Sequence, residues 1–205
     1  MRIALAQIDP TVGDIDGNLA LCLAAASQAA EAGADVVLLP ELALLGYPPE
    51  DLLGKPHFLE RSMAAAEQFA RMTPCTAVVG YAHRDSDGIF NAAAFFRNGV
   101  IECVYRKQLL PNYGVFDEER YFEAGMEDAV VEIAGVRCGI TVCEDAWFPE
   151  PSARVAQAGA RVLLNISASP FHVGKGRSRE NMLRDRAASN DLWLAYCNAA
   201  GGQDE

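Results

Sequence analysis

Near its middle the chain reads Gly139-Ile140-Thr141-Val142-Cys143-Glu144-Asp145-Ala146-Trp147. The run before the cysteine is short, apolar and β-branched, which is typical of a buried strand. The thiol follows where this strand should end, and open α/β sheets place their chemistry at the carboxyl ends of strands. The stretch therefore predicts a strand that delivers a thiol, two carboxylates and a tryptophan to one edge of a sheet.

Two other polar residues occupy the same kind of position. Glu41 follows the run Val36-Val37-Leu38-Leu39-Pro40, and Lys107 follows residues 101–106. A carboxylate, an amine and a thiol at three predicted strand ends form a candidate catalytic set.

The remaining pattern predicts an α/β fold. Strands over 2–8, 35–39 and 75–81 alternate with helices over 17–32 and 56–72. Asn98-Gly99 and Ala134-Gly135 predict hairpins, the first between strands 91–97 and 100–106 and the second between strands 129–133 and 136–142. A helix over 151–158, a strand over 161–166, a helix over 179–190 and a strand over 192–198 follow. Strands at both spacings imply a mixed sheet with helices packed on it.

The length, net charge and cysteine pattern of the chain argue against several classes of protein. The 205 residues fit one domain, and the net charge of -11 argues against nucleic acid or an anionic membrane as a general partner. No apolar run is long enough for a membrane span, and the start of the chain does not read as a signal peptide. The six cysteines form no CxxC pair, so free thiols in a reduced, cytoplasmic protein are expected, and three scattered histidines give a metal site little support.

The three strand-end residues can take different catalytic roles. Glu144 and Asp145 should raise the pKa of the Cys143 thiol, so a separate base must take its proton. Glu41 is the best candidate, since a carboxylate partly removed from water is a stronger base. Lys107 can stabilise an oxyanion together with a backbone N–H. Each residue also has an ordinary interpretation: a core cysteine, a helix-capping glutamate and a charged strand end.

In their local contexts these residues resemble the Glu-Lys-Cys triad of the nitrilase, or carbon–nitrogen hydrolase, superfamily. The resemblance runs the length of the chain and includes Ala4-Leu5-Ala6-Gln7, Leu39-Pro40-Glu41, Arg106-Lys107 and Cys143-Glu144-Asp145. It implies an α-β-β-α sandwich of mixed sheets flanked by helices, with Glu41 as base, Lys107 as oxyanion ligand and Cys143 as nucleophile.

A narrower resemblance is to the glutaminase domains of glutamine-dependent NAD+ synthetases. It rests on residues 45–52, 107–118, 143–147, 165–170 and 201–205. It implies glutamine as substrate and Glu118 as a second glutamate beside the triad. Tyr113, Ser169 and Lys175 would hold the glutamine, and Glu144 would contact its ammonium group. Without the resemblance, these residues would read as ordinary loop and surface positions.

The same resemblance sets expectations for the whole protein. Residues 1–205 would form a glutaminase domain that is incomplete at its C-terminal end and lacks the synthetase domain, where ATP, magnesium and deamido-NAD+ would bind. No cofactor is expected in this chain. The expected partners are that synthetase domain and further copies in a homo-oligomer. Two other functions stay open: a standalone amidase acting on a small ω-amide or N-carbamoyl compound, and a non-catalytic scaffold domain.

Overall fold

The computed structural model describes residues 1–202; Gln203, Asp204 and Glu205, which end the motif at 201–205, lie outside the described residues. The strands form two sheets. The first has the order β1-β2-β3-β4-β5, with parallel pairing from β1 to β3 and antiparallel pairing from β3 to β5. Its strands are β1 (Ile3–Leu5), β2 (Val36–Leu38), β3 (Ala77–Arg84), β4 (Ile89–Arg97) and β5 (Val100–Arg106).

The second sheet has the order β6-β7-β8-β9. It contains β6 (Ala129–Ile133), β7 (Val136–Val142), β8 (Val162–Ser167) and β9 (Trp193–Asn198). The β6–β7 pair is antiparallel, and β7, β8 and β9 are parallel. The expectation of mixed sheets is confirmed, but the strands divide between two sheets, whereas the residue pattern by itself indicated one.

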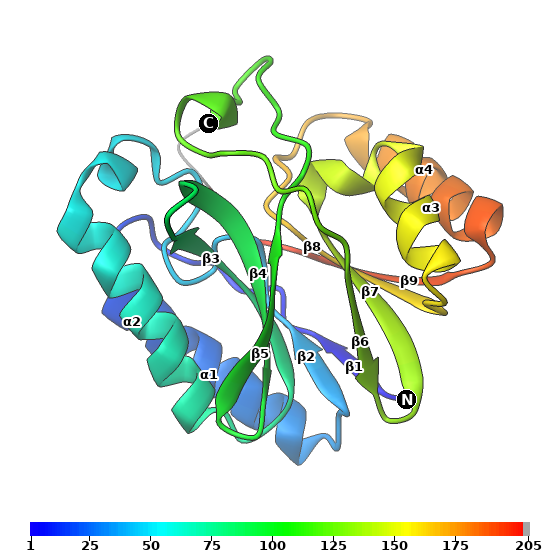
Figure 1. Cartoon of the computed structure of the whole chain (residues 1–205), viewed down its shortest axis with the longest axis horizontal. Coiled ribbons are helices and arrows are strands. Elements are labelled where there is room, and N and C mark those ends of the chain that lie inside the picture. The colour runs from blue at the N-terminus through cyan, green and yellow to red at the C-terminus, as the bar shows by residue number, and fades with distance from the viewer. Residues whose placement is uncertain (203–205) are drawn as a thin grey trace.

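Figure 1 shows the two sheets face to face, with α1 (Ile15–Glu31) and α2 (Pro56–Met72) outside the first and α3 (Pro149–Gln157) and α4 (Lys175–Asn190) outside the second. Three apolar clusters match these layers. One joins α1 and α2 to the first sheet, one lies between the sheets, and a smaller one lies under α3. The arrangement is the α-β-β-α sandwich that the family resemblance implied.

Local chemistry explains the hairpins. Asn98 and Gly99 both have positive φ, at 55° and 83°, and so do Ala134 and Gly135, at 47° and 76°. Two successive residues with positive φ match the right-handed twist of the flanking strands, which is why Asn-Gly favours this turn. Both predicted hairpins are present, with the second at its predicted bounds.

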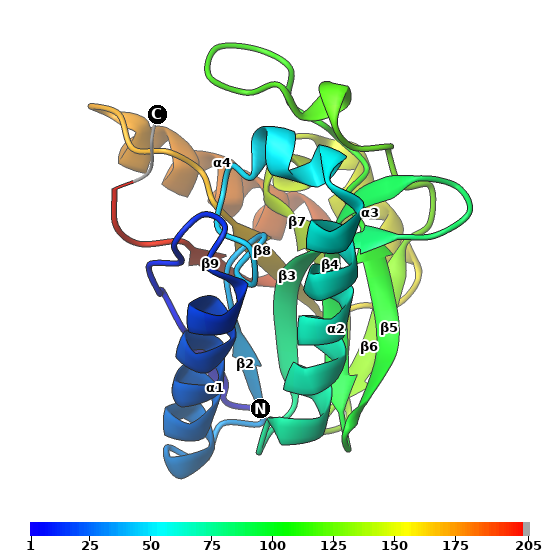
Figure 2. The ribbon, with the colours of Figure 1, turned by 90° about the vertical axis from the view of Figure 1, so that its left-hand side faces the viewer.

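Several long loops gather at one end of the sandwich. Figure 2 shows the loop after β5, the loop after β8 and the segment after β9 at this end, opposite the N-terminus. Three short 3₁₀ helices lie in such connections: Glu50–Gly54, Glu118–Arg120 and Cys143–Ala146. No helix within residues 1–202 is both long enough and apolar enough to cross a membrane.

Candidate active site

The three residues predicted at strand ends all lie at the loop end of the sandwich. Two residues separate the end of β2 from Glu41, Lys107 directly follows β5, and Cys143 directly follows β7. Glu41 belongs to a turn, not to a helix as the capping interpretation required. Gly80 of β3 allows this turn to approach closely, because a Cβ there would collide with the backbone of Glu41 and Leu42.

Lys107 is held between two carboxylates. Its Nζ lies 2.7 Å from Glu41 Oε1 and 2.8 Å from Glu118 Oε1, and the three side chains are 0%, 1% and 5% exposed. Burial lowers the pKa of Lys107, but attraction to Glu118 and Glu41 outweighs this effect and holds the pKa well above its usual value. Lys107 is therefore a permanent buried cation, which an oxyanion site requires.

Glu118 shares this buried site. Burial raises the pKa of Glu118, and repulsion from Glu41 adds to the rise, while Lys107 lowers it. Two carboxylates and one ammonium leave one excess negative charge inside the protein. Glu118 therefore accepts a proton more easily than an isolated surface carboxylate does.

Cys143 has a strained backbone and a protected thiol. Its φ is +43°, a left-handed value that non-glycine residues rarely adopt, and only 5% of the residue is exposed. Burial raises the pKa of the thiol well above its usual value; the Glu41 and Glu118 carboxylates raise it further, while Lys107 lowers it. From the sequence, we expected Glu144 and Asp145 to raise the thiol pKa. The carboxylates that raise the thiol pKa instead belong to other segments, one of them the expected base.

Three further groups orient these carboxylates and were not found from the sequence. Asn91 Nδ2 donates to Glu41 Oε1 at 2.7 Å and to Glu118 Oε2 at 3.3 Å. Tyr47 Oη donates to Glu118 Oε1 at 2.9 Å, and the backbone N–H of Ala168 donates to Glu41 Oε2 at 2.8 Å. An asparagine inside the apolar strand Phe90-Asn91-Ala92 was the available signal for the first of them.

The residues expected to bind substrate fall into two groups. Tyr113 Oη donates to Glu144 Oε1 at 2.9 Å; Tyr113 is exposed, whereas Glu144 is buried. Ser169 is buried on the other side of the site, and its Oγ accepts a hydrogen bond from Arg179 Nη2 at 3.0 Å. Lys175 is the first residue of α4 and not part of a surface loop.

A pocket of about 370 Å³ opens beside these residues. Its lining includes Ser169, Lys175 and Arg179, together with Ala168 and Tyr47, whose polar groups contact Glu41 and Glu118. Glu41, Lys107 and Cys143 are buried and are not among the lining residues. The pocket is thus a cavity with two cations in its wall, adjacent to a buried acid–base cluster.

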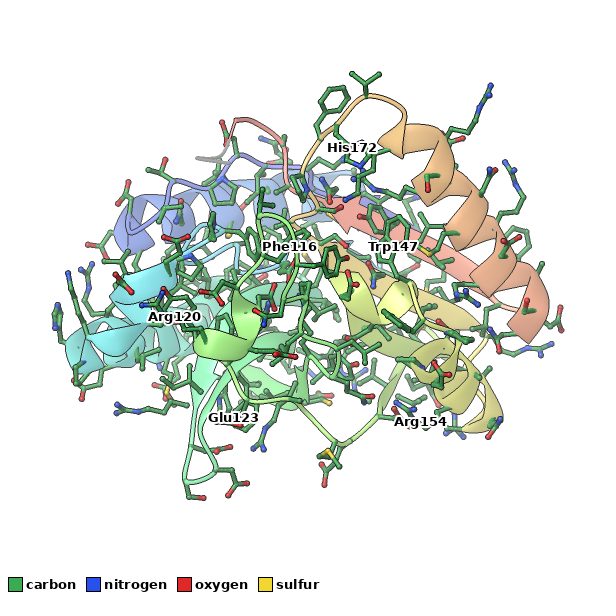
Figure 3. All side chains as sticks on the ribbon, turned by 90° about the horizontal axis from the view of Figure 1, so that it is seen from above. Phe116, Arg120, Glu123, Trp147, Arg154 and His172 are labelled. Carbon is green, nitrogen blue, oxygen red and sulfur yellow. The ribbon has the colours of Figure 1, made fainter. Side chains whose placement is uncertain are left out.

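Two aromatic rings lie near the Lys175 ammonium, one of the two cations in the pocket wall. Lys175 Nζ lies 6.0 Å from the centroid of Phe116 and 5.7 Å from that of Trp147. Figure 3 shows Phe116 and Trp147 on neighbouring segments at this end of the molecule, with His172 on the loop beside them. Within residues 1–202, no group of three or more His, Cys, Asp or Glu side chains is placed to hold a metal ion.

Comparison with known proteins gives a consistent result. Residues 2–205 match the family model described as carbon–nitrogen hydrolase. The chain is 45% identical to a glutamine-dependent NAD(+) synthetase from Thermotoga maritima, covering 100% of this chain and 36% of that protein. It is 44% identical to a protein of the same name from Xanthomonas campestris, covering 100% of this chain and 38% of the relative.

Solved structures agree in fold. A glutamine-dependent NAD+ synthetase from Acinetobacter baumannii, in complex with adenosine diphosphate, superposes with a TM-score of 0.95 at 37% identity, over 99% of this chain and 39% of that one. A mutant of an amidase from the nitrilase superfamily, from Nesterenkonia AN1, superposes with a TM-score of 0.88 at 28% identity, over 98% and 77% of the two chains. The chain thus spans less than two-fifths of the length of these three synthetases, but about three-quarters of the amidase.

Proposed function

Since the chain belongs to the carbon–nitrogen hydrolase family, we propose that it hydrolyses the side-chain amide of glutamine to glutamate and ammonia. The observation that carries this proposal is the buried Glu41–Lys107 pair, joined by Glu118, behind a pocket lined by Lys175 and Arg179. The names of the relatives supply glutamine as the substrate.

The first half of the reaction forms a thioester. The Cys143 thiol attacks the amide carbon of glutamine while Glu41 takes the thiol proton. The Lys107 ammonium and the backbone N–H of Glu144 stabilise the tetrahedral oxyanion. Glu41 then returns the proton to the amide nitrogen, the carbon–nitrogen bond breaks, and ammonia leaves.

The second half releases glutamate. A water molecule attacks the thioester carbon, and Glu41 accepts one of its protons. The new tetrahedral intermediate collapses with cleavage of the carbon–sulfur bond, and the proton returns to the sulfur. Because the pKa of the Cys143 thiol is raised, the resting enzyme keeps this proton, and thiol attack must be coupled to proton transfer.

The two cations in the pocket wall, Lys175 and Arg179, support a substrate that carries a carboxylate, as glutamine does, over a neutral amide. The Lys175 ammonium at the pocket wall would pair with the α-carboxylate, which Ser169 would also contact. The buried Glu144 carboxylate, fixed by Tyr113, would accept the α-ammonium group. Glu118 would hold Lys107 in place as the proton moves on and off Glu41.

We further propose that the ammonia is used by a synthetase domain of the same protein. The relatives that suggest it are named as glutamine-dependent NAD(+) synthetases and are much longer than this chain. ATP, magnesium and deamido-NAD+ would bind in that domain, not in residues 1–205.

The test uses the full-length protein with ATP, deamido-NAD+ and either glutamine or ammonium as nitrogen donor. Cys143→Ala should abolish glutamine-driven NAD+ formation, because no thioester can form, and leave ammonium-driven formation within about 2-fold of wild type. Measuring NAD+ with both donors separates the outcomes. Equal loss of both activities would count against the proposal.

A second function, a standalone amidase on a small ω-amide or N-carbamoyl compound, is favoured by the likeness to the Nesterenkonia amidases. A preference for a small uncharged amide over glutamine in steady-state assays would support this alternative. Reaction of Cys143 with neither substrate class would instead favour a non-catalytic scaffold.

A further inference from the structure

Asp145 is a buried carboxylate that the proposed reaction does not use. It is 0% exposed and lies two residues after Cys143, inside the 3₁₀ turn Cys143–Ala146. Burial raises the pKa of Asp145 to about 6, although hydrogen bonds from Val142, Tyr105 and Leu109 and the charge of Lys107 oppose the rise. An aspartate is costly to bury, so its contacts need an explanation.

One oxygen of Asp145 holds the segment that carries Lys107. Oδ1 accepts the backbone N–H of Gln108 at 3.1 Å and that of Leu109 at 2.9 Å, the two residues directly after Lys107. Gln108 and Leu109 lie beyond the end of β5, so their backbone N–H groups are outside the strand pairing of the sheet. The contact fixes the direction in which the chain leaves β5, and with it the base of the Lys107 side chain.

The other oxygen holds the turn that carries Cys143. Oδ2 accepts the backbone N–H of Val142 at 3.0 Å, directly before the nucleophile, and the hydroxyl of Tyr105 at 2.8 Å. The bond to Val142 closes the turn in which Cys143 has its φ of +43°. A strained backbone persists only when surrounding contacts determine it, and this bond is such a contact.

We propose that Asp145 is a positioning residue that ties the Cys143 turn to the Lys107 segment and so sets the distance between nucleophile and oxyanion ligand. These segments come from different sheets, β7 from the second and β5 from the first. Within residues 1–202 no strand pairing joins β5 to β7. The Asp145 carboxylate joins the two segments by hydrogen bonds, through Oδ1 to the backbone after Lys107 and through Oδ2 to Val142 and to Tyr105 of β5. The proposal rests on the proposed function in that glutamine turnover is one of its readouts.

The main variant is Asp145→Asn in the full-length protein. An amide replaces one acceptor oxygen with a donor that faces backbone N–H groups, so one segment is released. Because a 1 Å misplacement can reduce turnover by about two orders of magnitude, kcat for glutamine should fall about 100-fold while KM stays within about 3-fold. The rate of Cys143 alkylation by fluoroacetamide should fall in parallel.

A matched control separates positioning from folding. Asp14 accepts the backbone N–H of Gly17 at 3.0 Å at the start of α1, so it makes the same kind of bond outside the Cys143 turn and the Lys107 segment. Asp14→Ala should lower the melting temperature and leave kcat per folded molecule unchanged. If Asp145→Asn behaves like this control, or keeps kcat within about 3-fold of wild type, Asp145 has only a structural role and the proposal is overturned.

If Asp145→Asn does not fold, a second variant tests the positioning role of Asp145. Tyr105→Phe removes one of the donors to Oδ2 and nothing else, and it should lower kcat about 5-fold at unchanged KM. An unchanged kcat would then reject the proposal. If the wild type hydrolyses no glutamine but is alkylated by fluoroacetamide, the proposed function fails separately, and the alkylation rates still test Asp145.

Discussion

Lys107 has an unusual electrostatic position among the site residues. It is completely buried, with Glu41 on one side and Glu118 on the other, and Asn91 bridges the two carboxylates. Burying one ion pair is close to neutral in free energy, whereas removing one partner leaves an uncompensated charge. Lys107 should therefore matter for stability as well as for the proposed catalysis.

Replacing this cation tests that inference. Lys107→Met leaves the stem of the side chain but strands two buried carboxylates, and the free energy of unfolding should fall by about 3–5 kcal/mol at neutral pH. Urea titration measures it. Arg61→Met is the control, because its pair with Asp16 is exposed on both sides, and should cost less than about 1 kcal/mol. Similar losses in both variants would show that the Lys107 ion pairs add no special stability.

At the scale of elements, the helices and hairpins that could be predicted are those with clear turn residues or clear apolar spacing. The hairpin at Asn98-Gly99 follows from turn residues alone, and helix α2 has the bounds that its apolar spacing predicts. Helix α4 begins at Lys175, four residues before the predicted start, because its first turn contains Gly176 and polar residues without apolar periodicity. Only Met182 is buried in α4, so little of this helix was visible in the pattern.

In the candidate site, too, local features could be predicted and contacts between distant segments could not. The sequence placed Glu41, Lys107 and Cys143 at strand ends, and the structure brings their segments to one end of the sandwich. It could not divide the strands between two sheets, since that depends on packing between distant segments. For the same reason Asn91, Tyr47 and the N–H of Ala168 were missed: their partners lie 27 to 127 positions away. The catalytic roles stay predictions.

The start of α4 gives an element-scale prediction. Gly174 has a φ of +85° and Gly176 is helical, and a Cβ would meet nothing within 4 Å at either position. Backbone conformation is therefore the main difference between them. Gly174→Ala should destabilise the protein by about 1 kcal/mol, whereas Gly176→Ala should stabilise it by about 0.5–1 kcal/mol. Thermal unfolding of both variants checks the opposite signs, and equal shifts would contradict the assigned cap.

At the scale of the whole molecule, the buried thiols link stability to pH. Cys22 lies on the buried face of α1 and Cys197 lies between the sheets, and burial raises the pKa of each from 9.0 to about 12. Between these values the unfolded chain has lost protons that the folded chain keeps. The native state then binds more protons than the unfolded state, so stability must fall as the pH rises.

We expect each of the two thiols to reduce the free energy of unfolding by about 1.4 kcal/mol per pH unit above about pH 9. Urea midpoints measured from about pH 8 to about pH 11 report the slope. A Cys22→Ala, Cys197→Ala double variant should show a flatter dependence, whatever its stability at the lowest of these pH values. Identical slopes in the variant and the wild type would place the alkaline loss in other groups.

The bond from the backbone of Ala168 to Glu41 spans 127 positions of the chain. Cys143, Lys107 and Glu41 all leave the ribosome before residue 168 does. A nascent chain that already contains Cys143 therefore lacks the contact that orients Glu41, and contacts of such long range form late in folding. The proposed amide hydrolysis should therefore begin only after residue 168 has joined the fold, and recovery of activity after dilution from denaturant would report the final docking of the two sheets.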